Sequence, residues 1–263
     1  MKPTFVLMLP AKDEAANLRS LIPRAYDVGA SQVVVCDDGS TDETAEVARA
    51  LKATVLPHPE NRGLASTLRT LLDWGVENLK SDDKVVFMDA DGTMDPMIAV
   101  HALSNQAVRL SEVAIGSRFQ KGGGVVGLPR HRQLFSHLVS LFFRATHPID
   151  GVRDYTSGFR IYEVGFLQYY RTVFPFWFST DGFPAQTELL IRSSWLGAQI
   201  AEFPLVIEYG AKLGSSKMRV WRTVRDYFAV GMRLHLERVK LGRSQMRYYR
   251  EWPVEQLTDV ERR

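Results

Sequence analysis

The chain has 263 residues, of which 45% are hydrophobic and 24% are charged, and its formal net charge is +3. A globular chain of this length buries enough apolar surface to fold without disulfides or a structural metal. Its single cysteine, Cys36, excludes an internal disulfide and favours a reducing compartment. We expect no signal peptide, because the start lacks a basic region and a long apolar run. We also expect no membrane-spanning helix, since serines and a histidine interrupt the most apolar stretch, 134–143.

The first half of the chain alternates short apolar runs, rich in β-branched residues, with helical patterns. Strands are predicted at 5–9, 32–36, 54–56, 84–88 and 113–116, and helices at 13–26, 41–51, 63–78 and 96–110. This alternation predicts an α/β fold with a mostly parallel sheet covered by helices on both faces. Ligands of such sheets bind beyond the carboxyl ends of the strands, so the loops there are where a site is expected.

The second half begins with a glycine-rich loop at 120–127. Helices are then predicted at 133–147, 181–196 and 216–241, and a strand at 199–207. A strongly aromatic run occupies 174–178. The Gly-x-Gly-x-x-Gly fingerprint is absent after the first strand, which argues against a dinucleotide-dependent enzyme. The histidines show no metal-ligand spacing, which argues against zinc.

Two carboxylates, Asp89 and Asp91, directly follow the apolar strand at 84–88. Spaced one residue apart at a strand end, they can both face one hard cation, and carboxylate oxygens suit Mg²⁺ or Mn²⁺. Such an ion keeps positions open for diphosphate oxygens and neutralises the charge of a departing diphosphate. An Asp-x-Asp pattern is common in surface loops, so by itself it is weak evidence for a metal site, and other motifs in the chain must support it.

Those motifs lie at 9–18, 33–42 and 61–69, and all three precede the Asp-x-Asp pair in the chain. Together the four segments closely resemble family 2 glycosyltransferases of the GT-A fold. The resemblance runs from residue 4 to about residue 120. It implies a Rossmann-like α/β domain and a nucleotide-sugar donor. It assigns Pro10, Glu14 and Asp38 to the base and ribose, and Asp89 and Asp91 to the metal and the diphosphate.

Segments in the second half narrow the resemblance. Those at 115–119, 152–160, 186–188 and 214–218 are similar to polyprenyl-phosphate sugar synthases, including the dolichol-phosphate mannose synthases. This implies inverting transfer of a sugar from GDP-mannose or a UDP-hexose to a polyprenyl phosphate. The catalytic residues would be Asp91, Arg118 and Lys217, with Lys217 on the donor diphosphate.

The expected acceptor site consists of Arg118, Arg132 and Ser136. An arginine fork suits bidentate binding of oxyanions. A phosphate acceptor is already ionised near neutral pH, so it needs no general base. Asp154 and Arg160 are interpreted as structural supports of this site.

The helix predicted at 216–241 is basic and amphipathic. The segment 212–250 has a net charge of +9, which leaves −6 for the remainder. Its apolar stripe comprises Trp221, Val224, Phe228, Met232 and Val239, and its basic flank comprises Arg219, Arg222, Arg225, Arg233 and Lys240. A second candidate apolar face comprises Leu134, Phe135, Leu138, Leu141 and Phe142. Such a helix lies on an anionic membrane surface, or it packs on the body or on a partner chain.

These patterns predict a glycosyltransferase domain at 1–215, with a nucleotide-sugar half at 1–120 and an acceptor half at 121–215. The basic amphipathic helix and a polar tail occupy 216–263. We expect a peripheral protein at the cytoplasmic face of a membrane. Its partners would be a nucleotide-sugar, a polyprenyl phosphate, and a membrane surface or membrane partner subunit. Nucleic acid is not expected, because the motif context of base-reading modules is missing.

Two alternatives remain open at this stage. The first is an enzyme of the same fold that transfers the sugar to a hydroxyl of a glycan or glycolipid. It would require a carboxylate base, for which Asp154, Asp181 and Glu188 are the candidates. The second is a catalytically silent binding subunit with this fold.

Overall fold

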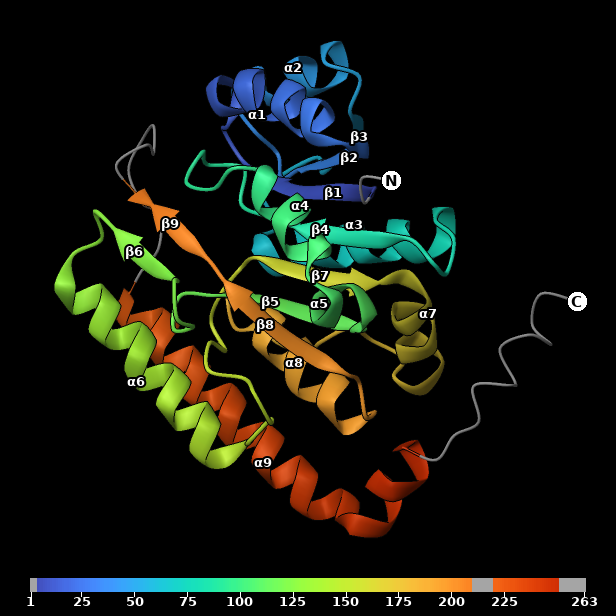
Figure 1. Cartoon of the computed structure of the whole chain (residues 1–263), viewed down its shortest axis with the longest axis vertical. Helices are drawn as coiled ribbons and strands as arrows, with labels where there is room; N and C mark the ends of the chain where they lie inside the picture. Colours follow the sequence, from blue (N-terminus) through green and yellow to red (C-terminus); the bar gives the residue numbers. More distant parts are fainter. Residues whose placement is uncertain (1–3, 210–219, 251–263) are drawn as a thin grey trace, which may run out of the picture.

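The computed structural model describes residues 4–209 and 220–250. A seven-stranded sheet runs through the molecule (Figure 1). Its strands, in spatial order, are β3 (Thr54–Pro57), β2 (Ala30–Asp37), β1 (Phe5–Ala11), β4 (Lys84–Phe87), β7 (Arg160–Glu163), β5 (Val113–Ser117) and β8 (Ile200–Pro204). All neighbours pair in parallel except β7, which is antiparallel to both β4 and β5. The predicted mostly parallel α/β sheet is confirmed.

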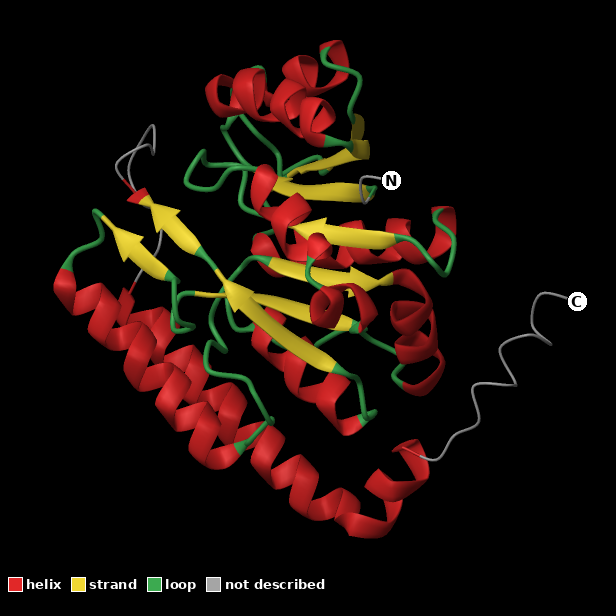
Figure 2. Cartoon of the chain, in the orientation of Figure 1, coloured by secondary structure: helices red, strands yellow, loops and turns green. Residues whose placement is uncertain are grey.

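A second, two-stranded sheet stands beside the main one (Figure 2). It pairs β6 (Gly124–Val126) with β9 (Val206–Glu208) in parallel. The sequence indicated only a glycine-rich loop at 120–127, because three residues are too few to show a strand period. In the fold, this small sheet joins the loop after β5 to the chain that leaves β8.

Helices cover both faces of the main sheet, as predicted. One face carries α1 (Ala15–Val28), α2 (Thr44–Ala50), α4 (Met97–Ser104) and α5 (Gln106–Leu110). The other carries α3 (Leu64–Asn78), α7 (Val164–Val173) and α8 (Ala185–Trp195), extended by α6 (Arg130–Thr146) and α9 (Val220–Arg250). Alternate residues of each strand supply the two cores, because successive side chains point to opposite faces. Cys36 lies in one of them, and burial raises the pKa of its thiol to about 12.

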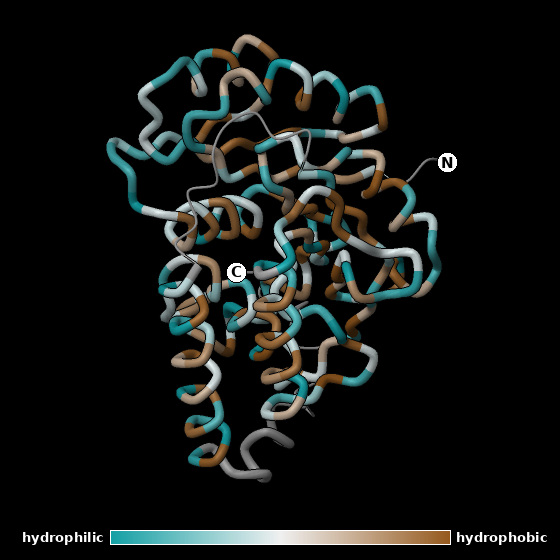
Figure 3. Tube along the Cα trace, turned by 90° about the vertical axis from the view of Figure 1, so that its left-hand side faces the viewer, coloured by the Kyte–Doolittle hydropathy of each residue, from teal (hydrophilic) through white to brown (hydrophobic). Residues whose placement is uncertain are grey.

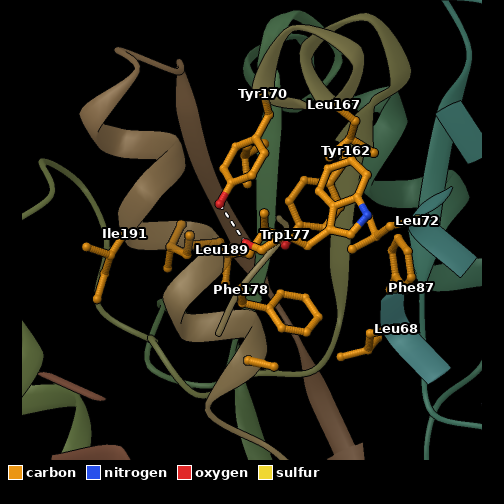
Figure 4. Packing of buried hydrophobic residues seen from close by; sticks show 14 of the residues in the cluster. Leu68, Leu72, Phe87, Tyr162, Leu167, Tyr170, Trp177, Phe178, Leu189 and Ile191 are labelled. Atoms are coloured by element: carbon orange, nitrogen blue, oxygen red, sulfur yellow. Dashed lines mark hydrogen bonds between the residues drawn. The ribbon is translucent and has the colours of Figure 1, made fainter. Parts of the chain in front are cut away.

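Most of the aromatic run at 174–178 belongs to the core beneath α7 and α8 (Figure 4). Trp177 and Phe178 are each 2% exposed, and Trp177 stacks on Tyr170 with ring centroids 5.5 Å apart. The hydroxyl of Tyr170 donates to the Trp177 carbonyl oxygen at 2.6 Å. In this run, Phe176 alone is an exposed large side chain, so the run mainly anchors the chain between α7 and α8.

Two long helices, α6 and α9, lie side by side along one flank of the molecule (Figure 1). Their close approach depends on Gly231, where a Cβ atom would fall 2.3 Å from the ring of Phe142. Phe142 then packs on Phe228, with ring centroids 4.5 Å apart. None of the described helices is both long and apolar enough to cross a bilayer.

Several helix boundaries differ from the sequence prediction. The helix expected at 96–110 is two helices, because Asn105 adopts an extended conformation (ψ 125°) and its side chain caps α5 by accepting from the Ala107 N–H. The helix expected at 13–26 is observed as α1, Ala15–Val28, which contains Pro23 without a break. The helix predicted at 216–241 is observed as α9, which continues to Arg250.

Candidate active site

The loops at the carboxyl ends of β1, β2, β4 and β5 contain most of the predicted site residues, as the parallel sheet requires. Pro10 lies in β1 opposite Cys36 of β2, and Glu14 immediately precedes α1. The Glu14 carboxylate accepts from the side-chain amide of Asn17 at 2.6 Å. Both residues therefore lie at the strand end where a donor nucleotide is expected.

Asp38 is buried and holds the neighbouring loop at 61–63. One of its carboxylate oxygens accepts from the Arg62 N–H and the other from the Gly63 N–H, both at 2.8 Å. Its Oδ1 atom is also 2.9 Å from His58 Nδ1, and His58 Nε2 is in turn 2.9 Å from the Thr70 hydroxyl. The carboxylate thus fixes the loop that precedes α3, a role that the sequence did not indicate.

The Asp-x-Asp pair follows β4. Asp91 is oriented by Thr93, whose hydroxyl and backbone N–H both donate to Asp91 Oδ1, at 2.7 and 3.2 Å. Asp89 lies against the loop that ends at Gly158, where a Cβ atom would be 3.5 Å from Asp89 Oδ1. No cluster of three His, Cys, Asp or Glu side chains suited to a metal occurs among residues 4–209 and 220–250. Two carboxylates fit an ion such as Mg²⁺ or Mn²⁺, which takes its remaining oxygen ligands from water and substrate phosphates.

Arg118 follows β5 and forms a buried ion pair with Asp154. Its Nε and Nη2 atoms donate to the two carboxylate oxygens, each at 2.7 Å, and its backbone N–H adds a third bond at 3.1 Å. Burial works to raise the pKa of Asp154, but the charge and hydrogen bonds of Arg118 hold that pKa below its ordinary value. The Arg118 Nη1 atom is directed to the Ser136 hydroxyl at 3.4 Å. Asp154 is therefore a support for Arg118; the sequence suggested a structural role for Asp154 but did not indicate this partner.

Arg160, also interpreted as a support, is completely buried under the same loop. Its guanidinium donates to the carbonyl oxygens of Ser157 and Tyr155, both at 2.9 Å. These bonds fix the backbone at 155–157, which leads from Asp154 to the glycine beside Asp89. Arg160 therefore shapes the loop that connects the two charged parts of the site.

A pocket of about 130 Å³ brings together four of the predicted site residues, namely Asp89, Arg118, Arg132 and Ser136. Pro10, Glu14 and Asp38 do not line it. Asp91 is two residues from Asp89 in the same loop, although it is not part of the lining. Lys217 lies outside the described residues.

The remaining wall of the pocket is largely apolar. It comes from α6 and the turn before it, from α9 and from the segment before α8, through Leu128, Phe135, Val139, Phe183, Val224 and Tyr227. The pocket therefore combines two arginines and a carboxylate with aliphatic and aromatic surface.

Two tyrosines of the pocket were missed by sequence reasoning. Tyr209 follows the predicted strand at 199–207, so its place at a strand end was a usable signal. Burial raises the pKa of Tyr209, with the Arg118 charge opposing the shift and the Asp89 charge adding to it. Tyr227 is on the face of α9 that carries no predicted function, and only the packing of α9 brings it to the pocket.

The three carboxylates considered as alternative general bases do not line this pocket. Asp154 is paired with Arg118. Glu188 is completely buried and accepts hydrogen bonds from Ser179, Thr180, Arg192 and Arg233. Asp181 has a side chain that is 95% exposed, 3.7 Å from Arg69. The geometry gives no support to these residues as bases acting in the pocket.

Four of the five residues of the predicted apolar stripe of α9 are exposed, whereas Val224 is half-buried and lines the pocket. The opposite side of the helix faces the core. Trp221, Phe228, Met232 and Val239 are 76%, 38%, 51% and 66% exposed, respectively. Tyr227, Val230 and Leu234, about half a turn away, are buried. On α6, Leu134, Leu138 and Leu141 are likewise 57%, 47% and 59% exposed. Figure 3 shows hydrophobic and hydrophilic residues alternating along these two long helices.

The fold and the pocket define an α/β protein with its site at the carboxyl end of a mostly parallel sheet. The sequence model for "Glycosyl transferase family 2" matches residues 7–171. The chain belongs to glycosyltransferase family 2 and is a glycosyltransferase.

Curated relatives cover most of the chain. An undecaprenyl-phosphate mannosyltransferase from Micrococcus luteus is 31% identical over 80% of this chain and 86% of its own length. A polyprenol monophosphomannose synthase from Mycolicibacterium smegmatis is 26% identical over 89% of both chains. A dolichol-phosphate mannosyltransferase from Pyrococcus furiosus is 29% identical over 84% of this chain and 60% of its own length.

Solved structures share the fold at lower identity. Glucosyl-3-phosphoglycerate synthase from Mycobacterium tuberculosis, in complex with Mn²⁺, uridine diphosphate and phosphoglyceric acid, matches with a TM-score of 0.64 at 20% identity. That match covers 88% of this chain and 78% of the other. The same synthase with Mn²⁺, UDP-glucose and phosphoglyceric acid matches with a TM-score of 0.61 at 18% identity, over 88% and 79% of the two chains. These likenesses establish the predicted GT-A architecture.

Proposed function

We propose that this glycosyltransferase moves a sugar from a nucleotide-sugar to a polyprenyl phosphate. The observation that carries the proposal is the pocket, which joins Asp89, Arg118, Arg132 and Ser136 to an apolar wall from α6 and α9. An amphiphilic acceptor with one phosphate and an isoprenoid chain matches both parts. The names of three curated relatives, each a mannose transferase or synthase for a polyprenyl or dolichol phosphate, support the same acceptor and favour mannose.

The acceptor phosphate would bind to the guanidinium groups. Asp154 and Thr156 occupy the Nε and Nη2 donors of Arg118, which leaves Nη1, beside Ser136, directed toward the pocket. Arg132 and the Ser136 hydroxyl line the same space. Because Asp154 holds Arg118 in place, the site is organised before the acceptor arrives, and little side-chain entropy is lost on binding.

The donor would occupy the adjoining strand ends, with the base and ribose near Pro10, Glu14 and Asp38. Both Asp38 oxygens already bond the loop at 61–63, so Asp38 would contribute mainly by shaping this loop. The donor is GDP-mannose or a UDP-hexose. Lys217, outside the described residues, remains the proposed contact of the donor diphosphate.

Asp89 and Asp91 would hold Mg²⁺ or Mn²⁺ between the protein and the donor diphosphate. When bound, the ion neutralises charge on the departing nucleoside diphosphate. Thr93 fixes the Asp91 carboxylate through two hydrogen bonds, which favours a defined ligand geometry. A single displacement by an acceptor oxygen held by Arg118 and Arg132 would invert the anomeric centre.

The exposed residues of α6 and α9 support attachment to a membrane surface, on its cytoplasmic side. The α6–α9 apolar face comprises Leu134, Leu138, Leu141, Trp221, Phe228, Met232 and Leu236. Arg222 and Arg225 on α9 have side chains 66% and 74% exposed, so positive charge accompanies this apolar surface. Inserting the apolar face into an anionic leaflet would present the adjoining pocket wall to the lipid acceptor.

A donor screen tests the reaction. The purified protein is incubated with GDP- and UDP-sugars, Mg²⁺ or Mn²⁺, and a short polyprenyl phosphate, and product masses are measured. A glycosyl polyprenyl phosphate is expected, and from an α-linked donor its coupling constants should show a β linkage. Transfer only to free sugars or glycan hydroxyls would overturn the proposal in favour of the hydroxyl-acceptor alternative. Nucleotide binding without turnover of any donor would instead favour a silent binding subunit.

The acceptor assignment is tested by Arg132→Ala. The Michaelis constant for polyprenyl phosphate should rise by about one to two powers of ten, since a charge-assisted contact contributes roughly 1.5–3 kcal/mol. Slow hydrolysis of the donor by water should change much less. Arg130→Ala is the matched control. Arg130 is exposed, lies about half a helical turn from Arg132 on α6 and does not line the pocket. Equal effects of the two substitutions would contradict the assignment.

Membrane attachment is tested by vesicle sedimentation. The double variant Trp221→Ser/Met232→Ser should bind anionic vesicles at least about tenfold more weakly. It lacks two large apolar side chains whose transfer from water into the bilayer favours binding. Leu110→Ser removes a similarly exposed side chain, at 61%, from α5 and should bind like the wild type. Unchanged binding by the double variant would argue against the α6–α9 apolar face and direct attention to a membrane partner subunit.

A further inference from the structure

A second recess lies on α6, outside the pocket that holds Asp89 and Arg132. It has a volume of about 480 Å³ and is lined by Phe119, His137, Ser140, Leu141, Arg144 and Arg153. At about 100° per residue, His137 and Arg144 lie nearly opposite the α6 residues that face α9. The recess therefore flanks the exposed side of α6 that is remote from α9.

The recess is basic and lacks a compensating carboxylate. Arg144 and Arg153 are both exposed, and within residues 4–209 and 220–250 neither is ion-paired to an acidic side chain. The backbone N–H of Arg153 donates to Glu202, which fixes the chain at this point without using the guanidinium. The imidazole of His137 adds a third nitrogen-bearing side chain to the same rim.

The floor contains a buried hydroxyl with unused hydrogen-bonding capacity. Ser140 is 2% exposed, and its Oγ atom has no hydrogen-bond partner among the described residues. A serine inside a helix commonly bonds to the carbonyl oxygen one turn earlier, so this arrangement is unusual. A buried hydroxyl without a partner costs free energy, which a rotation of Ser140 toward a bound acceptor group would recover.

We propose that this recess is a second phosphate-binding site, in which Arg144 and Arg153 bind the phosphate oxygens and His137 and Ser140 complete the contacts. Two guanidinium groups converging on one recess suit an oxyanion. The residues differ from those proposed for the acceptor phosphate, so the site does not depend on the proposed function.

Leu141, at 59% exposure, belongs both to the recess and to the α6–α9 apolar face. The bound phosphate would thus lie at the boundary between polar and apolar surface. The phosphodiester of an anionic phospholipid headgroup and a soluble phosphate compound share the required chemistry. The ring of Phe119 stacks on His137 with centroids 4.2 Å apart and also contacts the Arg118 guanidinium, 5.3 Å away. Phe119 therefore connects the recess directly to Arg118 of the candidate active site.

The test follows the imidazole signals of His137 in the full-length protein by ¹H–¹⁵N NMR, with His137→Asn assigning them. The probes are inorganic phosphate, glycerol phosphate and micelles of short-chain phosphatidylglycerol, with neutral maltoside micelles as the amphiphile control. A saturable shift is expected with at least one phosphate-bearing probe and none with maltoside. A shift with the lipid alone identifies a headgroup site, and equal shifts with the soluble compounds identify a soluble phosphate site.

Two variants separate the recess from the active site. Arg144→Gln/Arg153→Gln should weaken the titration at least about tenfold, because two charge-assisted contacts are lost. Lys80→Gln/Arg109→Gln removes the same charge from exposed positions elsewhere and should titrate like the wild type. Arg132→Ala should also leave the titration unchanged. The proposal is overturned if no phosphate-bearing probe shifts His137, or if the shift survives the first variant or disappears with Arg132→Ala.

Discussion

Two completely buried carboxylates, Asp154 and Glu188, hold two different regions of this glycosyltransferase in place. Asp154 fixes Arg118, which lines the pocket. Glu188 of α8 accepts from Arg192 of the same helix and from Arg233 of α9. Arg192 also reaches α9, where its two Nη atoms donate to Glu237 at 2.7 and 2.8 Å. The first region therefore orients a chemical group, and the second attaches a helix.

The two regions also differ in how much depends on a single contact. Arg118 has no second carboxylate partner among the described residues, so Asp154 alone balances its charge, and the hydroxyls of Thr156 and Ser136 add only neutral hydrogen bonds. Arg192 has two carboxylate partners, and the Arg233 side chain is 41% exposed and therefore accessible to water. Loss of Asp154 leaves the buried charge of Arg118 without an ion-pair partner. Loss of Glu188 leaves Arg192 with Glu237, and Arg233 with Thr180 and water. Burial alone does not tell these roles apart.

The largest expected effect is a loss of transfer rate with folding left intact, and it comes from the proposed metal ligands, Asp89 and Asp91. Asp91→Asn, or excess chelator, should lower the transfer rate by at least about a hundredfold, because charge on the departing diphosphate is no longer neutralised. The free energy of unfolding should stay close to that of the wild type, since Asp91 is only partly buried. The rate is measured by product formation and the stability by urea denaturation. Full turnover in excess chelator would refute metal dependence.

Next comes Asp154→Asn, which should impair both folding and activity. Removing one charge of a buried pair costs about 3–5 kcal/mol, because the guanidinium of Arg118 is left uncompensated. The remaining folded enzyme should also bind the acceptor more weakly. Urea denaturation and acceptor titrations measure the two effects, and Asp150→Asn, an exposed carboxylate in the same loop, is the matched control. A variant as stable as this control would contradict the supporting role of Asp154.

Glu188→Gln should have a smaller effect of a different kind. We expect a loss of about 1–3 kcal/mol, since Arg192 retains Glu237 and Arg233 can turn to water. Loosening α9 should raise the Michaelis constant of the acceptor more than it lowers kcat, because α9 supplies Val224 and Tyr227 to the pocket. Steady-state kinetics on the folded fraction distinguish the two constants. A selective fall in kcat would instead point to a direct catalytic role for Glu188.

The remaining expected effect is absent at neutral pH and is a pH dependence of stability on the α9 side. Burial, together with the nearby Arg238 and His235 charges, lowers the pKa of His147 to about 4 from the ordinary value of 6.5. The unfolded chain therefore takes up a proton at higher pH than the folded one. The corresponding stability is present above pH 6.5 and is lost as the pH falls toward 4.

This loss should be on the order of 2–3 kcal/mol, from the pKa difference. Because the pKa of Asp154 is lowered, its ion pair with Arg118 should keep contributing to stability until the pH falls below the ordinary range of a carboxyl group. Urea denaturation between pH 7 and pH 4 should show a slope that His147→Gln reduces. The exposed His101 provides the control variant His101→Gln. Identical slopes in all three proteins would exclude His147 as the source.

Much of the first half of the chain was predictable from the sequence because its signals are local. The strands at 5–9 and 84–88 were evident from apolar runs, and Asp89 and Asp91 lie at the predicted strand end. Arg118 was likewise placed at the end of β5 before its partners were known. The order of the motifs along the chain then indicated the family, which the comparisons confirm.

The second half of the chain shows the limits of sequence-based prediction. The periodicity of 216–241 revealed an apolar stripe at Trp221 and Met232 but not that this stripe faces outward. The core-facing residues, such as Tyr227 and Leu234, occupy the other side of the same helix. A helix with apolar residues on two sides has no unique buried face until its neighbours are known. In α9, Gly231 leaves room for the ring of Phe142, so the side of the helix that contains Gly231 packs against α6.

The sequence by itself determined the alternation of strands and helices, the strand-end position of the carboxylates and the family, because short-range periodicity and motif order record them directly. The tertiary structure alone decided that Asp154 serves Arg118 from 36 residues away and that Glu188 and Arg192 attach α9 from positions 45 residues distant. It also decided which tyrosines complete the pocket. Such pairings depend on how the chain folds back on itself, and a buried charge is tolerated only where that folding supplies its partner.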